Sequence, residues 1–166
     1  MTVTERSYSG TAVAAVIFTA MLTGVMYRYW PSDERSIRRH LSNLAEALSI
    51  PSTDSAEERL TRFAVLREYF SPEVRIRLED REIASRETLI AELSQWRPPP
   101  GGLAVEFVDI TVAVAEDRGS ARVTLSAKAS TTDATGKSTV DERAADVLML
   151  KRDGDWVISS ATLRSL

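Results

Sequence analysis

The chain has 166 residues, of which 27% are charged and 43% hydrophobic, with a formal net charge of −3 and no cysteine. This length suits one ordinary globular domain and one short additional segment. Without cysteine there is no disulfide scaffold, thiolate metal site or cysteine nucleophile, and a single histidine, His40, argues against a zinc site. The slightly acidic charge balance, without a long run of Lys or Arg, argues against nucleic-acid binding. We expect neither a metal nor an organic cofactor.

An uncharged and mostly apolar stretch, residues 7–27, lies near the N-terminus. A helix of this length is about 31 Å long, which matches the hydrocarbon thickness of a bilayer. Tyr29 and Trp30 follow it, as aromatic side chains at a membrane interface do. The sequence therefore predicts a tail and a single transmembrane helix over residues 1–30, followed by a soluble domain over residues 31–166.

Two other interpretations of this stretch stay open. A cleaved signal peptide also has a basic start and an apolar middle, although residues 26–31 show no small-residue cleavage site. A buried or interfacial helix is the third interpretation. The arginines close to the C-terminal side of the stretch are Arg28, Arg35, Arg38 and Arg39. Counted as topogenic signals, they would hold the soluble domain in the cytoplasm.

Two helices are predicted at the start of the soluble domain. Apolar residues recur at steps of four, three and four, as on one face of a helix that begins near Ser32 and ends near Ser49. They are Ile37, Leu41, Leu44 and Leu48. A capping box from Ser55 to Glu58 opens the second helix, which we expect to end at Phe70. Its expected apolar side carries Leu60, Phe63, Ala64 and Phe70, and its expected solvated side Glu57, Glu58, Arg59 and Arg62.

A strand, a short return strand and a third helix follow. Residues 73–79 alternate apolar side chains with arginines, which is typical of a half-buried strand, and residues 82–84 return beside it. Ser85 caps the third helix, and three prolines with two glycines at 98–102 end it. The apolar side of this helix comprises Leu89, Ile90, Leu93 and Trp96.

From residue 103 onward the apolar residues recur with period two, which predicts four consecutive antiparallel strands. The expected strands are 103–115, 121–130, 138–151 and 156–163. A tight hairpin turn is predicted at 152–155. In the first strand we expect Val108, Ile110, Val112 and Val114 on one face and Val105, Phe107, Asp109 and Thr111 on the other.

This order of elements and four local phrases resemble the nuclear transport factor 2-like superfamily, which includes SnoaL-like polyketide cyclases and ketosteroid isomerases. The matching phrases are Asp33-Glu-Arg-Ser-Ile-Arg-Arg39, Glu68-Tyr-Phe-Ser-Pro-Glu-Val74, Ala84-Ser-Arg-Glu-Thr-Leu-Ile-Ala-Glu-Leu93 and Leu150-Lys-Arg-Asp-Gly-Asp-Trp-Val-Ile158. Over residues 32–166 the resemblance implies an α+β fold in which three helices pack in a curved, cone-shaped antiparallel sheet. The open end of such a cone holds a small apolar ligand in some members, and other members are non-catalytic interaction domains.

Membrane-anchored versions of this fold look like assembly factors of type IV secretion systems and accessory proteins of bacterial lipid-import systems. In those the folded domain faces the periplasm or the cell exterior, so the resemblance implies export, against the arginine count. The basic residues, 18 Arg against 3 Lys, are typical of a GC-rich bacterial genome.

Catalytic members of the superfamily place an acid or base inside the apolar cone, where desolvation shifts its pKa. The candidate here is Asp146, which shares a strand face with Ala144, Leu148 and Leu150. If the alternate residues Ala145, Val147 and Met149 face inward instead, Asp146 is solvated. Further candidates for an acid and arginine constellation, without a spacing that identifies one, are Asp109, Asp141 and Arg143.

Tyr69, Trp96 and Trp156 are the candidate ligand-binding residues. Tyr69 is the single tyrosine of the domain, and it lies on the second helix rather than the first, so no hydrogen-bond donor to an oxyanion is carried over from the isomerases. The two tryptophans either line a ligand site or belong to the core. His40 lies on the flank of the first helix and is expected to be structural or exposed.

Two functions follow from these observations. The first is a membrane-tethered, non-catalytic domain that acts in protein–protein interaction or envelope complex assembly. The second is a small-molecule site in the cone, as in an isomerase, cyclase or dehydratase, or a carrier of a lipid-like ligand. Homodimerisation is compatible with either, because the resemblance implies contact through the outer sheet face, where Thr124, Ser126 and Lys128 are not prohibitive.

Overall fold

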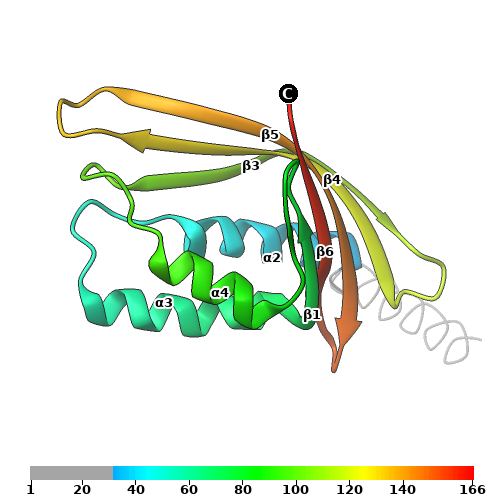
Figure 1. Cartoon of the computed structure of the whole chain (residues 1–166). Helices are drawn as coiled ribbons and strands as arrows, with labels where there is room; N and C mark the ends of the chain where they lie inside the picture. The colour runs from blue at the N-terminus through cyan, green and yellow to red at the C-terminus, as the bar shows by residue number, and fades with distance from the viewer. Residues whose placement is uncertain (1–31) are drawn as a thin grey trace, which may run out of the picture. The chain divides into compact units, whose positions relative to one another are not determined.

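Three helices lie against one face of a curved six-stranded sheet (Figure 1). This is a computed structural model, and it describes residues 32–166. The helices are α2 (Asp33–Leu48), α3 (Ala56–Tyr69) and α4 (Arg86–Gln95). The strands are β1 (Phe70–Arg77), β2 (Glu82–Ile83), β3 (Leu103–Val114), β4 (Ser120–Thr132), β5 (Ser138–Arg152) and β6 (Asp155–Ser165).

The predicted transmembrane segment, residues 7–27, lies outside the described residues. Within residues 32–166, no helix has the length and apolar character that crossing a membrane requires.

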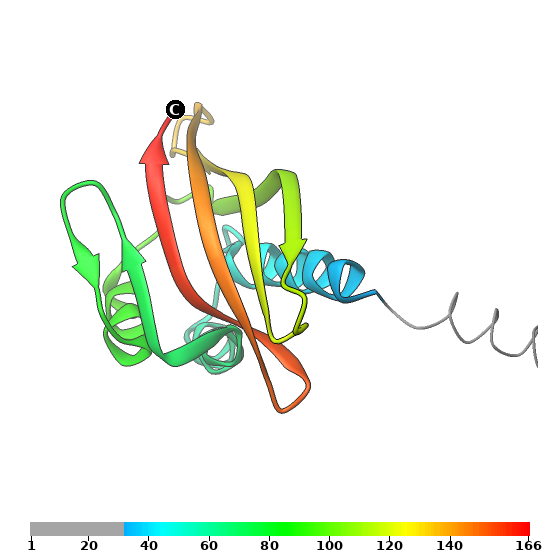
Figure 2. The same cartoon turned by 90° about the vertical axis from the view of Figure 1, so that its right-hand side faces the viewer.

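The sheet is mixed, with the strand order β2-β1-β6-β5-β4-β3 (Figure 2). β1 runs parallel to β6, with Ile76 opposite Ala161, and the other neighbouring strands are antiparallel. The prediction of an antiparallel sheet is therefore wrong at this one pair. A parallel pair is possible because a helix and four strands separate β1 from β6 along the chain, which is ample for a crossover.

A bulge in β3 exchanges the two faces of this strand partway along its length. The register with β4 shifts between Val108 and Thr111, where Asp109 has a φ of +52°. One extra residue reverses the inward and outward alternation, so Phe107 before the bulge and Ile110 after it both pack against the core. The prediction that Phe107 and Ile110 lie on opposite faces is wrong because strict period two does not persist through the bulge.

The hydrophobic core lies between the sheet and the helices. α2 buries the predicted stripe, in which Ile37 and Leu41 are almost inaccessible to solvent. β5 turns alternate residues toward the helices: Ala145, Val147 and Met149. β6 adds Trp156, which is 2% exposed.

α3 begins as predicted but turns a different side to the core. Its capping box is complete, because the Ser55 N–H donates to the Glu58 carboxylate at 2.8 Å and the Glu58 N–H donates to Ser55 Oγ at 3.2 Å. Its one buried side chain is Leu66, whereas Leu60 is 72% exposed. The predicted apolar side is therefore wrong at Leu60 and Ala64, which are exposed.

Two arginines explain this difference, because they occupy half-buried positions on the inner side of α3. Arg62 donates two hydrogen bonds to the Asp54 carboxylate, at 2.8 and 3.0 Å, and Arg59 donates one at 3.2 Å. A paired guanidinium tolerates partial burial, which a hydropathy pattern does not register. The expectation that Arg59 and Arg62 belong to the solvated side is thus also wrong.

Gly102 packs closely against Ile50, which lies two residues after the end of α2. Its φ is +87°, and a Cβ atom at this position would lie 2.4 Å from the carbonyl oxygen of Ile50. The neighbouring Leu103 exchanges two backbone hydrogen bonds with Ile50, at 2.7 and 2.8 Å. Gly136, in the turn between β4 and β5, has a similar φ of +83°, but nothing lies within 4 Å of its Cβ position.

We expect Gly102→Ala to lower the free energy of unfolding more than Gly136→Ala does. Both substitutions place an L side chain in the left-handed region, at a cost of about 1 kcal/mol. Only Gly102→Ala adds a steric clash, which costs about 1–3 kcal/mol more. Urea unfolding followed by tryptophan fluorescence measures both values, and equal losses would contradict the close approach of Gly102 to Ile50.

Candidate functional site

The candidate site begins with the charged and polar residues that the structure buries. Within residues 32–166 these are Asp33 and Ser71. Asp33 opens α2, and its carboxylate accepts hydrogen bonds from Lys151 Nζ at 2.8 Å and from Arg118 Nε at 2.6 Å. The Lys151 hydrogen bond, with a further contribution from Arg118, holds the pKa of Asp33 below its ordinary value despite desolvation. Asp33 is therefore an ionised anchor rather than an acid held neutral by burial.

Asp146 lies on the outer face of the sheet, away from the helices. Its neighbours Ala145 and Val147 point into the core, so Asp146 points the other way and is half-buried. Its carboxylate accepts a hydrogen bond from Arg164 on β6. The structure thus shows the alternative in which Ala145, Val147 and Met149 face inward, and it separates Asp146 from the helix-side residues.

Tyr69 and His40 form a ring contact between α3 and α2. Their ring centroids are 4.6 Å apart at an interplanar angle of 52°. His40 Nε2 is buried and has no hydrogen-bond partner within the described part of the chain. Burial lowers the pKa of His40, although the Asp155 charge opposes this. Burial also raises the pKa of Tyr69, with smaller contributions from the carboxylates of Glu68 and Glu46.

The two candidate tryptophans lie in different surroundings. Trp96 follows the last residue of α4 and is 43% exposed. Trp156 belongs to the core, and Lys151 Nζ lies 5.5 Å from the centroid of its ring. Trp156 Nε1 is buried without a hydrogen-bond partner among residues 32–166. Lys151 therefore contacts both Asp33 and Trp156 and links the start of α2 to the beginning of β6.

The remaining acidic candidates do not gather around one point. Asp109 is exposed in the β3 bulge, and Asp141 accepts a hydrogen bond from Arg143 at 3.0 Å on the surface. That hydrogen bond raises the pKa of Arg143. Over residues 32–166 the structure shows no group of acidic or histidine side chains arranged to hold a metal ion.

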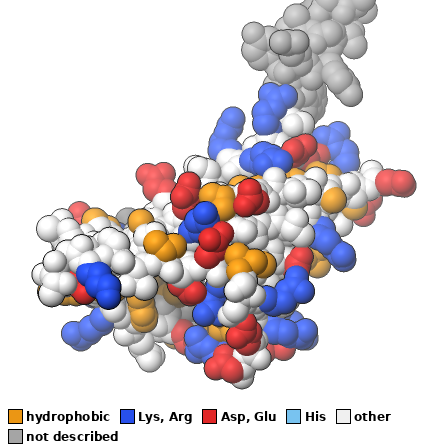
Figure 3. Space-filling view, turned by 90° about the horizontal axis from the view of Figure 1, so that it is seen from above, with side chains coloured by type: hydrophobic (Ala, Val, Ile, Leu, Met, Phe, Trp, Pro, Cys, Tyr) orange, Lys and Arg blue, Asp and Glu red, His pale blue; other side chains and the backbone are white. Residues whose placement is uncertain are grey.

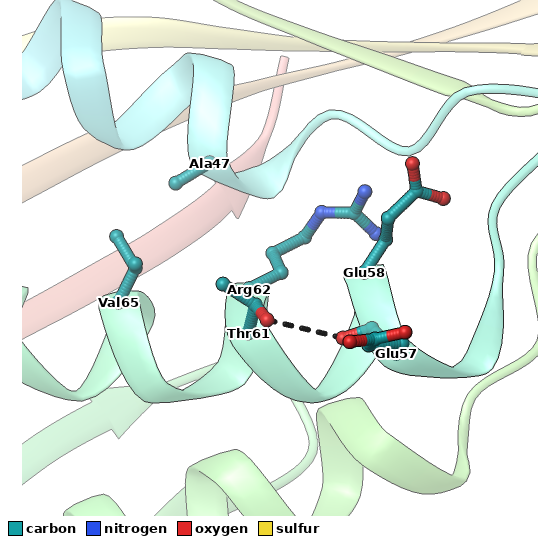
Figure 4. Close-up of a pocket in the computed structure, with 6 residues that line it drawn as sticks. All are labelled: Ala47, Glu57, Glu58, Thr61, Arg62 and Val65. Carbon is teal, nitrogen blue, oxygen red and sulfur yellow. Dashed lines mark hydrogen bonds between the residues drawn. The ribbon is translucent and has the colours of Figure 1, made fainter.

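Sequence reasoning missed a solvent-facing groove between α2 and α3, shown in Figure 4. Its volume is about 460 Å³. It is lined by Ala47, Glu57, Glu58, Thr61, Arg62 and Val65. The available signal was the spacing of the apolar residues in α3. Leu60 and Val65 lie on other sides of the helix than Leu66, so a helix that buries Leu66 leaves both of them exposed.

Comparisons with family profiles and with curated protein sequences find no match. Comparison with solved structures finds many similar folds. A proposed scytalone dehydratase from Novosphingobium aromaticivorans is 14% identical, covers 81% of this chain and 84% of its own, and has a TM-score of 0.64. The association domain of calcium/calmodulin-dependent protein kinase II from Caenorhabditis elegans is 12% identical, with coverages of 80% and 95% and a TM-score of 0.63.

A third structure, a nuclear transport factor 2-like protein with a cystatin-like fold from Novosphingobium aromaticivorans, is 12% identical. It covers 97% of this chain and 92% of its own, with a TM-score of 0.64. Identities this low show the fold alone. The predicted α+β, nuclear transport factor 2-like fold is confirmed for the described residues, with a mixed rather than antiparallel sheet.

We expect Asp33→Asn to lower the free energy of unfolding by about 2 kcal/mol at neutral pH, because a charge-assisted contact is lost and Lys151 keeps its charge. The pKa of Asp33 lies below the ordinary 3.8, so its contribution is complete above that value and is lost as the pH falls through the folded-state pKa. Urea unfolding across this range should show the two proteins converging at low pH. Asp80→Asn, at an exposed position, is the control, and an equal loss there would contradict the prediction.

The half-buried imidazole of His40 predicts a separate pH dependence. Its pKa is lowered in the folded protein, so below about 6.5 the unfolded chain binds more protons and stability falls with pH. We expect His40→Gln to remove this slope between about pH 7.5 and about pH 5.5. Urea midpoints at the two pH values measure it, and identical slopes for the variant and the unmodified chain would show that His40 is not the titrating group.

Proposed function

We propose that this chain, whose fold is nuclear transport factor 2-like, is a membrane-tethered, non-catalytic interaction domain. In this proposal residues 7–27 anchor it in a bacterial membrane, its folded domain faces the periplasm or the cell exterior, and it acts in the assembly of an envelope complex. The observation that carries the proposal is the composition of the outer face of the sheet.

The outer face carries paired charges at its centre, together with two arginines, Arg122 opposite Leu148 and Arg75 opposite Ser160, that make no ion pair among residues 32–166. Thr124 of β4, Asp146 of β5 and Thr162 of β6 lie side by side across the three strands. Small and apolar residues that share this face are Ser126, Ala144, Leu148, Leu150 and Val157. Figure 3 looks onto the molecule from above, where apolar side chains lie between charged side chains of both signs.

The ion pairs on this face determine what burying it would cost. Asp146 is paired with Arg164, and Lys128 Nζ lies 3.6 Å from a Glu142 carboxylate oxygen. A partner can cover these two ion pairs without leaving an uncompensated charge, whereas Arg122 and Arg75 require an acceptor from that partner. Leu148, 38% exposed, offers an apolar contact at the centre. These properties suit a second copy of the chain or another protein.

The interior supports binding at the surface rather than chemistry in the cone. Apolar side chains from α2, α3 and the sheet fill the space between the layers. The two carboxylates that are almost fully buried in the described domain are already paired, Asp33 with Lys151 and Arg118 and Asp54 with Arg59 and Arg62. Among the similar structures, the kinase association domain bears the name of an interaction module.

We expect the full-length chain in neutral detergent to form a dimer that Ser126→Arg disrupts. The substitution places an unpaired charge in the neutral centre of the outer face. Leu60→Arg, at an exposed position on α3, is the matched control and should leave the dimer intact. Native mass spectrometry measures both. A monomeric unmodified chain, or a dimer that only Leu60→Arg disrupts, would overturn the assignment of this face.

The alternative function is a small-molecule site in the cone. It is favoured by two buried nitrogen atoms on the helix side that lack partners among residues 32–166, His40 Nε2 and Trp156 Nε1. A small, mostly apolar molecule that carries a polar group could form a hydrogen bond with either nitrogen atom. The same mass spectra decide between the two functions, because a co-purifying molecule of defined mass would support the alternative and contradict a purely interacting domain.

The tether and its orientation are tested in cells. We expect the chain to stay in the membrane fraction after alkaline carbonate extraction, because a spanning helix is not released by charge repulsion. In spheroplasts a C-terminal tag should be digested by added protease. Extraction into the soluble fraction would contradict the tether, and a protected tag would place the domain in the cytoplasm.

A further inference from the structure

Two arginines of the outer sheet face lie in one row that crosses the strands. Strand pairing places Arg75 of β1 beside Ser160 of β6. It also places Leu148 of β5 between Ser160 and Arg122 of β4. Both arginines are exposed, and neither makes an ion pair within the part of the chain that the structure describes. This basic row, from Arg75 to Arg122, therefore carries two positive charges without a partner.

An acidic row crosses the same face further along the strands. Glu106 of β3, Lys128 of β4 and Glu142 of β5 lie side by side. Lys128 Nζ lies 3.6 Å from a Glu142 carboxylate oxygen, whereas Glu106 is exposed and has no ion pair among the described residues. Two carboxylates against one ammonium group leave the row with one net negative charge. Lys128 follows Arg122 by six residues, so the two rows are about 20 Å apart along β4.

The surface between the two rows allows another sheet to approach closely. Thr124 and Ser126 of β4 lie there, with Ala144 of β5 beside Ser126. The two charged groups at this level of β5 and β6, Asp146 and Arg164, are paired with each other. Figure 2 shows the strands that carry these residues side by side. Short side chains permit the spacing of about 10 Å that is usual between stacked sheets.

The two rows distinguish between the orientations that a symmetric contact of this face with itself can take. If the two-fold axis runs along the strands, each row meets the same row of the copy, so that arginines face arginines. If the axis crosses the strands between Thr124 and Ser126, the rows exchange, and the basic row of each copy lies over the acidic row of the other. Like charges disfavour the first orientation, and opposite charges favour the second.

We propose that two copies of this chain bind through the outer face with their strands antiparallel across the contact, and that Arg122 of each copy pairs with Glu106 of the other. Arg122 and Glu106 lie on the neighbouring strands β4 and β3, so the exchange leaves them about 4.8 Å apart sideways, which a long arginine side chain spans. The proposal rests on dimerisation through this face, and it adds the orientation of the copies and the pair that determines it.

The test uses the full-length chain in neutral detergent, and native mass spectrometry over a dilution series gives the dissociation constant of the dimer. We expect Arg122→Glu and Glu106→Arg each to weaken the dimer about ten- to hundredfold, because each replaces two symmetry-related attractions by two repulsions. Arg122→Glu/Glu106→Arg in one chain should restore it. Mixing the two single variants should give a heterodimer, recognised by its mass, that is tighter than either homodimer. Added salt should weaken the unmodified dimer.

The matched controls are Arg97→Glu and Glu57→Arg, which reverse the same charges at exposed positions outside the sheet. Both should dimerise like the unmodified chain. Single variants that dimerise normally, a double variant that stays monomeric, or a mixture without preference for the heterodimer would each overturn the pairing. A dimer that Ser126→Arg disrupts and the charge reversals leave intact would refute this orientation alone. A monomeric unmodified chain would overturn both the orientation and the use of this face.

Discussion

The ion pairs of Asp33 determine how the helical layer is attached to the sheet. Its carboxylate is held by Lys151 at the end of β5 and by Arg118 in the turn between β3 and β4, so two parts of the sheet that are distant in sequence but adjacent in space meet the first turn of α2. Lys151 also lies over the ring of Trp156. With its first turn held, α2 lays its apolar stripe across the strands, and α3 follows through a short connection.

The consequence of this arrangement is a domain with two different surfaces. The sheet turns its outer face to solvent, and on this face Asp146 is paired with Arg164. On the helical side, Arg59 and Arg62 of α3 share the carboxylate of Asp54. Charge pairing thus shapes both surfaces, and on the outer face it favours contact with a copy of the chain or with another protein.

Much of the fold was predictable because its signals are local. The capping box at Ser55, the cap at Ser85 and the alternation along β4 and β5 each depend on a few consecutive residues. The tight turn between β5 and β6 is as local, since Asp153 and Gly154 both adopt a positive φ and leave Arg152 opposite Asp155. The candidate groove was not predictable, because its lining combines α3 with Ala47 of another helix.

The sequence by itself determined the order of the helices and strands and the apolar stripe of α2, because hydrophobic period and capping chemistry act over neighbouring residues, although β1 begins at Phe70 and not at residue 73. Only the tertiary structure decided the parallel pairing of β1 with β6 and the bulge at Asp109, which depend on strands that meet from distant parts of the chain. It also decided that Asp146 faces outward and that Leu60 remains exposed. Both outcomes depend on which side of each element packs against the rest of the domain. Arg62 pairs with Asp54 and Asp146 pairs with Arg164, and no local sequence pattern indicates either pair.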